Sequence, residues 1–154
     1  MPTTQRAELT TPSPTEILAV RVFDAPRALV FAAHTEPDHV RRWLLGPDGW
    51  SMPICEIDLR PGGAWRYVWR HDTDGREFGM HGVYLEVEAP ARTVSTEVFE
   101  EPPGAVNTLE LTEEGGRTTM TVTMRYPSEE VRDTGLATGM TGGMETSYLR
   151  LRAL

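Results

Sequence analysis

The sequence contains a single cysteine, Cys55, so neither an intramolecular disulfide nor a cysteine-based metal cluster can form. It has no apolar run near the roughly 20 residues that a membrane-spanning helix needs. Its first residues lack the apolar segment of a secretory signal. We therefore expect a soluble cytoplasmic protein that does not act in a membrane.

Signatures of metal, cofactor and hydrolase sites are also missing. The histidines His34, His39, His71 and His81 have no ligand spacing on a shared face, so we expect no metal site. No Gly-x-Ser-x-Gly elbow is present. The glycine pairs fall in expected hairpin turns, and none follows a strand into a helix as a phosphate loop does. We expect no cofactor.

Basic residues are outnumbered, with 15 Lys and Arg against 23 Asp and Glu and a formal net charge of −8. Nucleic-acid backbones and anionic membranes both call for a basic surface on their partner. The acidic residues are spread along the chain, which is typical of a solvated surface. We therefore expect neither nucleic acid nor a membrane as the partner.

The most informative segment that is present is an aromatic strand. A turn signal at residues 60–63 comes directly before residues 64–71, which alternate. Trp65, Tyr67 and Trp69 then point to one face of a sheet. Three large aromatic side chains on one face must be covered either by a core or by a ligand.

The 154 residues are enough for one domain, which we place at residues 15–154. Residues 1–14 are rich in Thr and Pro and lack periodicity, so we expect a flexible tail. Start signals at Asp24-Ala25-Pro26 and at residues 35–38 predict two short helices after the first strand. Hydrophobic alternation predicts seven strands, at residues 16–23, 50–58, 64–71, 76–87, 92–99, 106–112 and 117–126.

A long amphipathic helix is predicted from Ser128 to the C-terminus. Its apolar face carries Leu136, Met140, Met144, Tyr148 and Leu151. Four glycines cluster beside this face, at Gly135, Gly139, Gly142 and Gly143. Each costs a helix about 1 kcal/mol relative to alanine. Either they let the helix pack closely on the strands, or they leave space beside flexible methionines, as a promiscuous apolar pocket would.

We predict that the residues facing the interior, where a ligand would contact them, are aromatic residues and methionines. They are Trp65, Tyr67, Trp69, Phe78, Met80, Met140, Met144 and Tyr148. Core packing alone also explains such an apolar stripe. An interior glycine, Gly82, predicts a bulge or sharp bend in its strand, and His81 beside it should face solvent.

Candidates for acid–base chemistry are few. Asp133 falls on the apolar side of the last helix, where it is either at a cavity mouth or an exposed acid of the first turn. The orientation of Glu86, beyond Gly82, is undecided. The phenols of Tyr67 and Tyr148 need a partner if buried, and a ligand could supply one. None of these residues forms a diagnostic catalytic arrangement, so the sequence leaves open whether the protein is an enzyme.

Several motifs together resemble one family. They are Asp24-Ala25-Pro26, Trp43, the run Asp58-Leu59-Arg60-Pro61-Gly62-Gly63, Asp74-Gly75, Gly82-Val83-Tyr84-Leu85-Glu86-Val87 and Gly139-Met140. The chain is similar to bacterial homologues of the activator of the 90-kDa heat-shock-protein ATPase, in the START/Bet v 1-like (SRPBCC) superfamily. The resemblance covers about residues 15–154, and the run at 58–63 is its most specific part.

The resemblance implies an α+β helix-grip fold, with a seven-stranded antiparallel sheet wrapped around the long C-terminal helix and an apolar cavity between them. It implies binding of a hydrophobic or aromatic small molecule. Two alternatives remain: a polyketide cyclase-like or aromatase-like enzyme using the same cavity, and a protein-interaction module like the chaperone cofactor. Homodimerisation is plausible by analogy alone. Many relatives have a tryptophan where Met144 stands, so the cavity should differ in shape.

Overall fold

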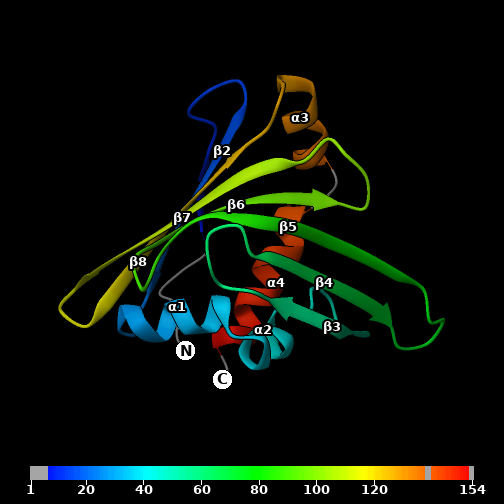
Figure 1. The fold of residues 1–154 in the computed structure, drawn as a ribbon, viewed down its shortest axis with the longest axis horizontal. Coiled ribbons are helices and arrows are strands. Elements are labelled where there is room, and N and C mark those ends of the chain that lie inside the picture. The colour runs from blue at the N-terminus through cyan, green and yellow to red at the C-terminus, as the bar shows by residue number, and fades with distance from the viewer. Residues whose placement is uncertain (1–6, 138–139, 153–154) are drawn as a thin grey trace.

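The computed structural model describes residues 7–137 and 140–152, and its strands form one antiparallel sheet. The eight strands follow the order β1-β2-β8-β7-β6-β5-β4-β3 across the sheet (Figure 1). Their bounds are β1 (Glu8–Thr10), β2 (Glu16–Phe23), β3 (Trp50–Ile57), β4 (Ala64–His71), β5 (Glu77–Glu88), β6 (Arg92–Phe99), β7 (Ala105–Glu114) and β8 (Arg117–Arg125). The α+β class and the antiparallel sheet of a helix-grip fold are therefore as predicted.

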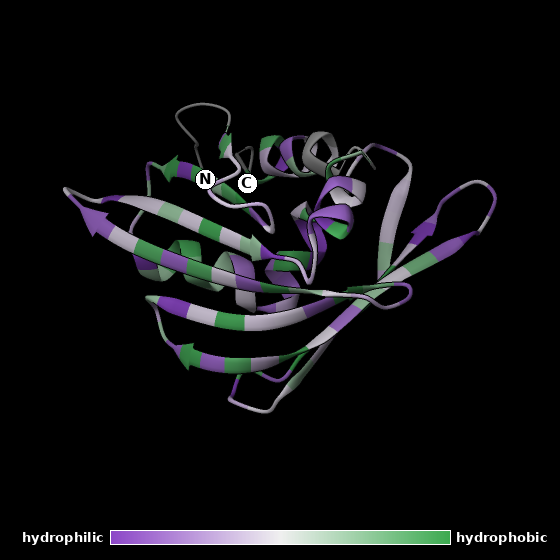
Figure 2. Ribbon diagram, turned by 90° about the horizontal axis from the view of Figure 1, so that it is seen from above, coloured by the Kyte–Doolittle hydropathy of each residue, from purple (hydrophilic) through white to green (hydrophobic). Residues whose placement is uncertain are grey.

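The helices are α1 (Arg27–Thr35), α2 (Pro37–Trp43), α3 (Glu129–Ala137) and α4 (Met140–Arg152). Figure 1 shows α1 and α2 at the lower end of the curved sheet, with α4 descending towards them from α3. Figure 2 shows hydrophilic and hydrophobic residues alternating along the strands as the sheet curves around the helices. None of the helices in the described part of the chain is long and apolar enough to span a membrane.

The inner face of the sheet is defined by its contacts with the helices. Trp69 on β4 donates its indole N–H to the carbonyl oxygen of Leu44, just after α2, at 2.7 Å. On β8, the sulfur of Met120 lies 3.9 Å from the hydroxyl oxygen of Tyr148 on α4. Because successive side chains of a strand point to opposite faces, these contacts fix the orientation of the alternate residues along each strand.

Two apolar clusters hold the helices against this face. The larger lies where α1, α2 and α4 meet the lower sheet, and its largest buried residues are Phe23, Phe31, Trp43, Leu111, Met120 and Tyr148. The smaller joins α2 to β3 and β4 through Val40, Met52, Cys55 and Trp69. Full burial of one such side chain contributes about 1.5–3 kcal/mol, so these clusters fix the lower half of the fold.

The strand count corrects the prediction of seven strands. The additional strand, β1, lies inside the segment expected to be a tail, and it forms the edge of the sheet by pairing antiparallel with β2. All three of its residues are exposed. A strand with no buried side chain has no hydrophobic alternation, so the sequence carried no signal for it.

The segment predicted as the long C-terminal helix is helical on both sides of residues 138–139, as α3 and α4. Gly139 lies in the stretch 138–139, outside the described residues. Helical spacing of apolar residues continues on both sides of that stretch.

The predicted bulge at Gly82 is not found there. The register between β5 and β6 shifts between Tyr84 and Glu86 instead, while Gly82 pairs regularly with Trp65 on β4. A side chain at Gly82 would overlap the carbonyl oxygen of Thr96. The glycine is therefore required for close approach of backbone and indole, the other common reason for a glycine within a strand.

Candidate functional site

Away from the lower core, the inner face of the sheet is only half-buried. The half-buried residues with inward orientation are Tyr67, Ser95, Glu97, Asn107, Leu109, Val122 and Met124. Asn107 is paired across the sheet with Ser95 and with Met124, so the three share a face. Four residues further along β7, Leu111 is fully buried. Coverage of the inner face therefore decreases along β7 from Leu111 to Asn107, and the next inward residue, Ala105, is buried again.

The surface of α4 that faces the sheet also becomes more exposed towards the N-terminal end of the helix. Tyr148 is 5% exposed, whereas Met144, one turn earlier on the same helix face, is 36% exposed. Ser147 is buried and accepts a hydrogen bond from the backbone N–H of Gly46 at 2.9 Å. One turn before Ser147, a Cβ atom added at Gly143 would meet no atom within 4 Å. The N-terminal half of α4 is thus loosely covered where its C-terminal half is closely packed.

The helix glycines accordingly serve two purposes. A Cβ atom added at Gly135 on α3 would lie 3.2 Å from the hydroxyl oxygen of Tyr126, so this glycine permits a close approach. At Gly143 the added atom would enter open space. Gly139 lies outside the described residues, as does the side-chain environment of position 142. Close packing therefore explains Gly135, and it does not explain Gly143.

Tyr148 closes the lower end of this half-buried region. Its hydroxyl lies 2.9 Å from Nε2 of His34, whose Nδ1 lies 2.7 Å from the carbonyl oxygen of Val30. A carbonyl can only accept, so Nδ1 carries the proton and Nε2 accepts from the phenol. Burial lowers the pKa of His34 to about 4 and raises the pKa of Tyr148. The phenol therefore has a protein partner and does not depend on a ligand for one.

A buried ion pair lies beside Tyr148 and was not predicted from the sequence. Arg21 on β2 is 4% exposed, pairs with Glu145 on α4, and places its guanidinium 4.0 Å from the centre of the Tyr148 ring. Removing one member of such a pair leaves an uncompensated buried charge. The sequence signal was available, because Arg21 interrupts the inward alternation of β2 between Ala19 and Phe23.

A second polar cluster lies on the half-buried inner face, and it too was missed. Burial raises the pKa of Glu97 on β6, partly offset by a hydrogen bond from the side chain of Asn107 on β7. Burial also raises the pKa of Tyr67 on β4 well above its ordinary value, and the nearby Tyr84 and Glu97 raise it further. Alternation inward from Phe99 through Glu97 to Ser95 was the signal that could have revealed the carboxyl.

The indole N–H groups of the two predicted tryptophans on β4 both donate hydrogen bonds to backbone carbonyl oxygens of the protein. Trp65 donates its indole N–H to the carbonyl oxygen of Thr96 at 3.1 Å, and Trp69 donates to Leu44. Phe78 stacks on Trp69 with ring centres 5.0 Å apart. Met80 packs, partly buried, against the smaller cluster. Tyr67 also packs, partly buried, against the smaller cluster, and its ring contacts those of Trp65 and Trp69.

The structure describes the side-chain burial of one of the two methionines predicted to contact a ligand from α4, but not of the other. Met144 is partly exposed, at the loosely covered end of the helix. The side-chain environment of Met140 lies outside the described residues. Tyr148, by contrast, belongs to the packed core. Among the residues of the predicted apolar face whose burial the structure describes, Tyr148 and Leu151 are the buried ones.

The predicted acids Asp133 and Glu86 do not reach the inner face. Both are exposed, and they pair with Arg132 and Arg92 respectively, each at 2.8 Å. Asp133 is thus the exposed acid of a first helical region, and neither residue is a candidate for chemistry inside the fold. Within residues 7–137 and 140–152, no three His, Cys, Asp or Glu side chains gather closely enough to hold a metal ion.

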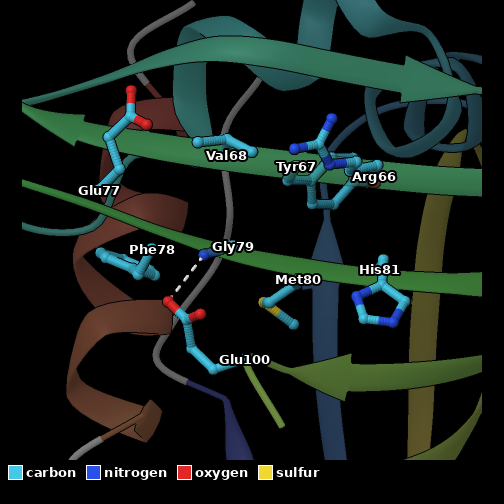
Figure 3. A pocket seen from close by; sticks show the side chains of 9 residues that line it. All are labelled: Arg66, Tyr67, Val68, Glu77, Phe78, Gly79, Met80, His81 and Glu100. Carbon is cyan, nitrogen blue, oxygen red and sulfur yellow. Dashed lines mark hydrogen bonds between the residues drawn. The ribbon is translucent and has the colours of Figure 1, made fainter.

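Two grooves lie on the outer face of the sheet. One, of about 280 Å³, lies over Gly79 and is bordered by Arg66, His81 and Glu100 (Figure 3). Glu100 accepts a hydrogen bond from the backbone N–H of Gly79 at 3.1 Å, the dashed line in Figure 3. The other, of about 500 Å³, lies over Trp65 and Gly82. None of the residues that line either groove belongs to a described helix, and exposed charged side chains border both, so they are poor sites for enclosing an apolar ligand.

Solved structures of bacterial proteins share this fold. A protein from Rhodobacter sphaeroides is 30% identical, with a TM-score of 0.88 and coverage of 96% of both chains. A protein from Nitrosomonas europaea is 26% identical, with a TM-score of 0.80, and covers 93% of this chain and 95% of its own. CalU16 from Micromonospora echinospora is 24% identical with a TM-score of 0.62, which supports the fold alone.

No curated protein matches the chain significantly. A family model does match, that of the Activator of Hsp90 ATPase homolog 1-like protein, over residues 24–154. This range contains every strand from β3 onward and all four helices. Because the match spans most of the sequence and the fold agrees, the chain belongs to the Activator of Hsp90 ATPase homolog 1-like family, within the START/Bet v 1-like (SRPBCC) superfamily.

Proposed function

We propose that this protein binds a hydrophobic or aromatic small molecule between the N-terminal half of α4 and the half-buried inner face of the sheet. The observation that carries the proposal is the paired change in coverage on the two facing surfaces. Tyr148 and Leu111 are buried, whereas Met144 and Asn107, further from the core, are not. Apolar groups such as Leu109, Val122 and Met124 would supply most of the contact area.

A second candidate, a polyketide cyclase-like enzyme in the same place, is favoured by one specific observation. Such an enzyme needs an inward acid or base with a shifted pKa. Glu97 is inward and half-buried, and burial raises its pKa, while Tyr67 lies close enough to interact with it electrostatically. Asp133 and Glu86 are not proposed for this role, because both are exposed and paired.

One incubation read in two ways separates binding from catalysis. The purified protein is mixed with fatty acids, sterols and aromatic polyketides, its melting temperature is recorded, and each compound is then analysed by chromatography. A ligand that binds only the folded state raises the melting temperature. A shift with the compound unchanged supports the binding protein, and a changed compound supports the enzyme. The absence of any shift or turnover across the panel would contradict the proposal.

Filling the space at Gly143 provides a matched pair of variants. Gly143→Leu places a branched side chain where an added Cβ meets nothing within 4 Å, so we expect at least a tenfold loss of ligand affinity, or about 1.4 kcal/mol. Gly143→Ala should keep binding and raise the free energy of unfolding by about 1 kcal/mol, because alanine is the better helix former. Calorimetry measures the ligand affinity of each variant, and urea unfolding measures its free energy of unfolding. Full affinity in the leucine variant would place the ligand elsewhere.

A further inference from the structure

We infer that the N-terminal arm, residues 7–15, forms one side of the ligand region, and that Leu9 on this arm contacts the ligand. The inference deepens the proposed function and depends on it. It makes β1 a wall of the site, and it favours an elongated apolar ligand over a compact one.

The pairing of β1 with β2 turns the side chain of Leu9 towards the helices. Leu9 lies directly opposite Ala19 on β2, and directly opposite residues of paired strands share one face of the sheet. Two residues after Ala19, Arg21 pairs with Glu145 on α4. Because alternate residues of a strand point to the same face, Ala19 and Leu9 point to the inner face as Arg21 does.

Leu9 is the outermost member of a row of apolar side chains that crosses the inner face. The row runs through paired residues of four neighbouring strands and consists of Leu9, Ala19, Val122 and Leu109. Neighbouring strands lie about 4.8 Å apart, so the row is about 14 Å long. Leu109 and Val122 pack, partly buried, against the larger cluster, whereas Leu9 is 45% exposed. An elongated apolar molecule lying along this row would contact all four side chains.

Hydrogen bonds on both sides of β1 attach the arm to the two C-terminal helices. The backbone N–H of Ala7 donates to Oε1 of Glu145 on α4 at 3.2 Å. The carbonyl oxygen of Ser13 accepts from Nη1 of Arg132 on α3 at 2.8 Å. The side chains of Glu145 and Arg132 are only 17% and 13% exposed, so solvent competes weakly for either bond. Leu9 is therefore held between two points of attachment.

An inward leucine that is held in place but left uncovered favours contact with a ligand. A leucine packed against α3 or α4 would be buried, whereas nearly half of Leu9 is exposed. The arm also reaches α4 at the correct end of the helix, because Glu145 directly follows the partly exposed Met144. Burial of apolar surface against a ligand is favourable, so Leu9 should add to the affinity of any ligand long enough to reach it.

The first test uses N-phenyl-1-naphthylamine, a neutral, elongated aromatic probe whose fluorescence rises in apolar surroundings. Leu9→Ala should bind the probe about fivefold more weakly than the wild type, because the truncation removes apolar contact area. Its melting temperature should stay close to that of the wild type, because Leu9 is exposed. Leu18→Ala, on the opposite face of β2, is the matched control and should keep the wild-type affinity. Equal affinity of both variants and the wild type would overturn the inference.

A second measurement uses the wild-type protein and requires no variant. Nuclear Overhauser effects between the bound probe and ¹³C-labelled methyl groups should appear at Leu9, Val122 and Leu109. Effects at Val122 and Leu109 without any at Leu9 would overturn the inference and leave the proposed function standing. Effects confined to outer-face methyl groups such as those of Val83, or failure of the probe to bind, would overturn the proposed function and the inference together.

Discussion

Replacing Gly82 with alanine is expected to cost the protein at least about 3 kcal/mol of its free energy of unfolding. The added Cβ atom would overlap the backbone carbonyl of Thr96 and come within 2.8 Å of the indole nitrogen of Trp65. Neither can move freely, because Trp65 donates its N–H to that same carbonyl. Relief requires separating β5 from β6 or expelling the indole. Since small domains are stable by only about 5–15 kcal/mol, much of the protein should unfold on mild heating.

The matched control for this variant is Gly79→Ala on the same strand. A Cβ atom at Gly79 would lie 3.1 Å from the carbonyl oxygen of Tyr67, a tight contact that a shift of a few tenths of an ångström relieves. Its cost should stay near 1 kcal/mol, in the ordinary range for a single substitution. Urea unfolding of both variants supplies the comparison. If Gly82→Ala is no less stable than Gly79→Ala, the close packing of Trp65 over Gly82 is wrong.

Lowering the pH from about 6.5 to about 4 should remove about 3 kcal/mol of stability through His34 alone. Burial among aromatic rings, together with the positive charge of Arg21, lowers the pKa of this residue from 6.5 to about 4, while the hydrogen bond that it donates to the carbonyl oxygen of Val30 works in the opposite direction. Above pH 6.5 His34 is neutral in both the folded and unfolded states, so its contribution is fully present. Between 6.5 and 4 only the unfolded state takes up the proton, which favours unfolding.

The measurement is the free energy of unfolding against pH for the wild type, His34→Gln and His81→Gln. Carboxyl groups also titrate in this window, so the difference between proteins carries the information. His34→Gln should be less stable than the wild type at pH 7.5 and should lose about 3 kcal/mol less between pH 6.5 and 4. His81 is exposed, and its variant should follow the wild-type curve. A His34→Gln curve parallel to that of the wild type would contradict the burial of a neutral histidine.

Most of the fold was predictable because its signals are local. Strands such as β4 alternate cleanly, and the turn at residues 60–63 precedes it as predicted. The edge strand β1 could not be predicted, since none of its residues is buried and its only stabilisation is pairing with β2.

The candidate site was predictable only in part, because its polar members depend on pairing between distant strands. The alternate spacing of Trp65, Tyr67 and Trp69 correctly placed them on one face of β4. Spacing could not show that Tyr67 is half-buried whereas the two tryptophans are buried and hydrogen-bonded to backbone carbonyls. Glu97 and Asn107 lie on different strands, and only the β6–β7 register brings them together. The sequence could not supply that register. The acids chosen instead, Asp133 and Glu86, lie where helix spacing and strand parity were least certain.

The most direct test of ligand binding between α4 and the inner face is an NMR titration of the ¹⁵N-labelled protein with 2-naphthol. Backbone amide shifts should move at Gly143, Glu97 and Asn107, which border the proposed site, and stay fixed at Gly79 and His81 over the outer grooves. That outcome would place the ligand beneath α4. Shifts confined to Gly79 and His81 would place it on the outer face and contradict the account.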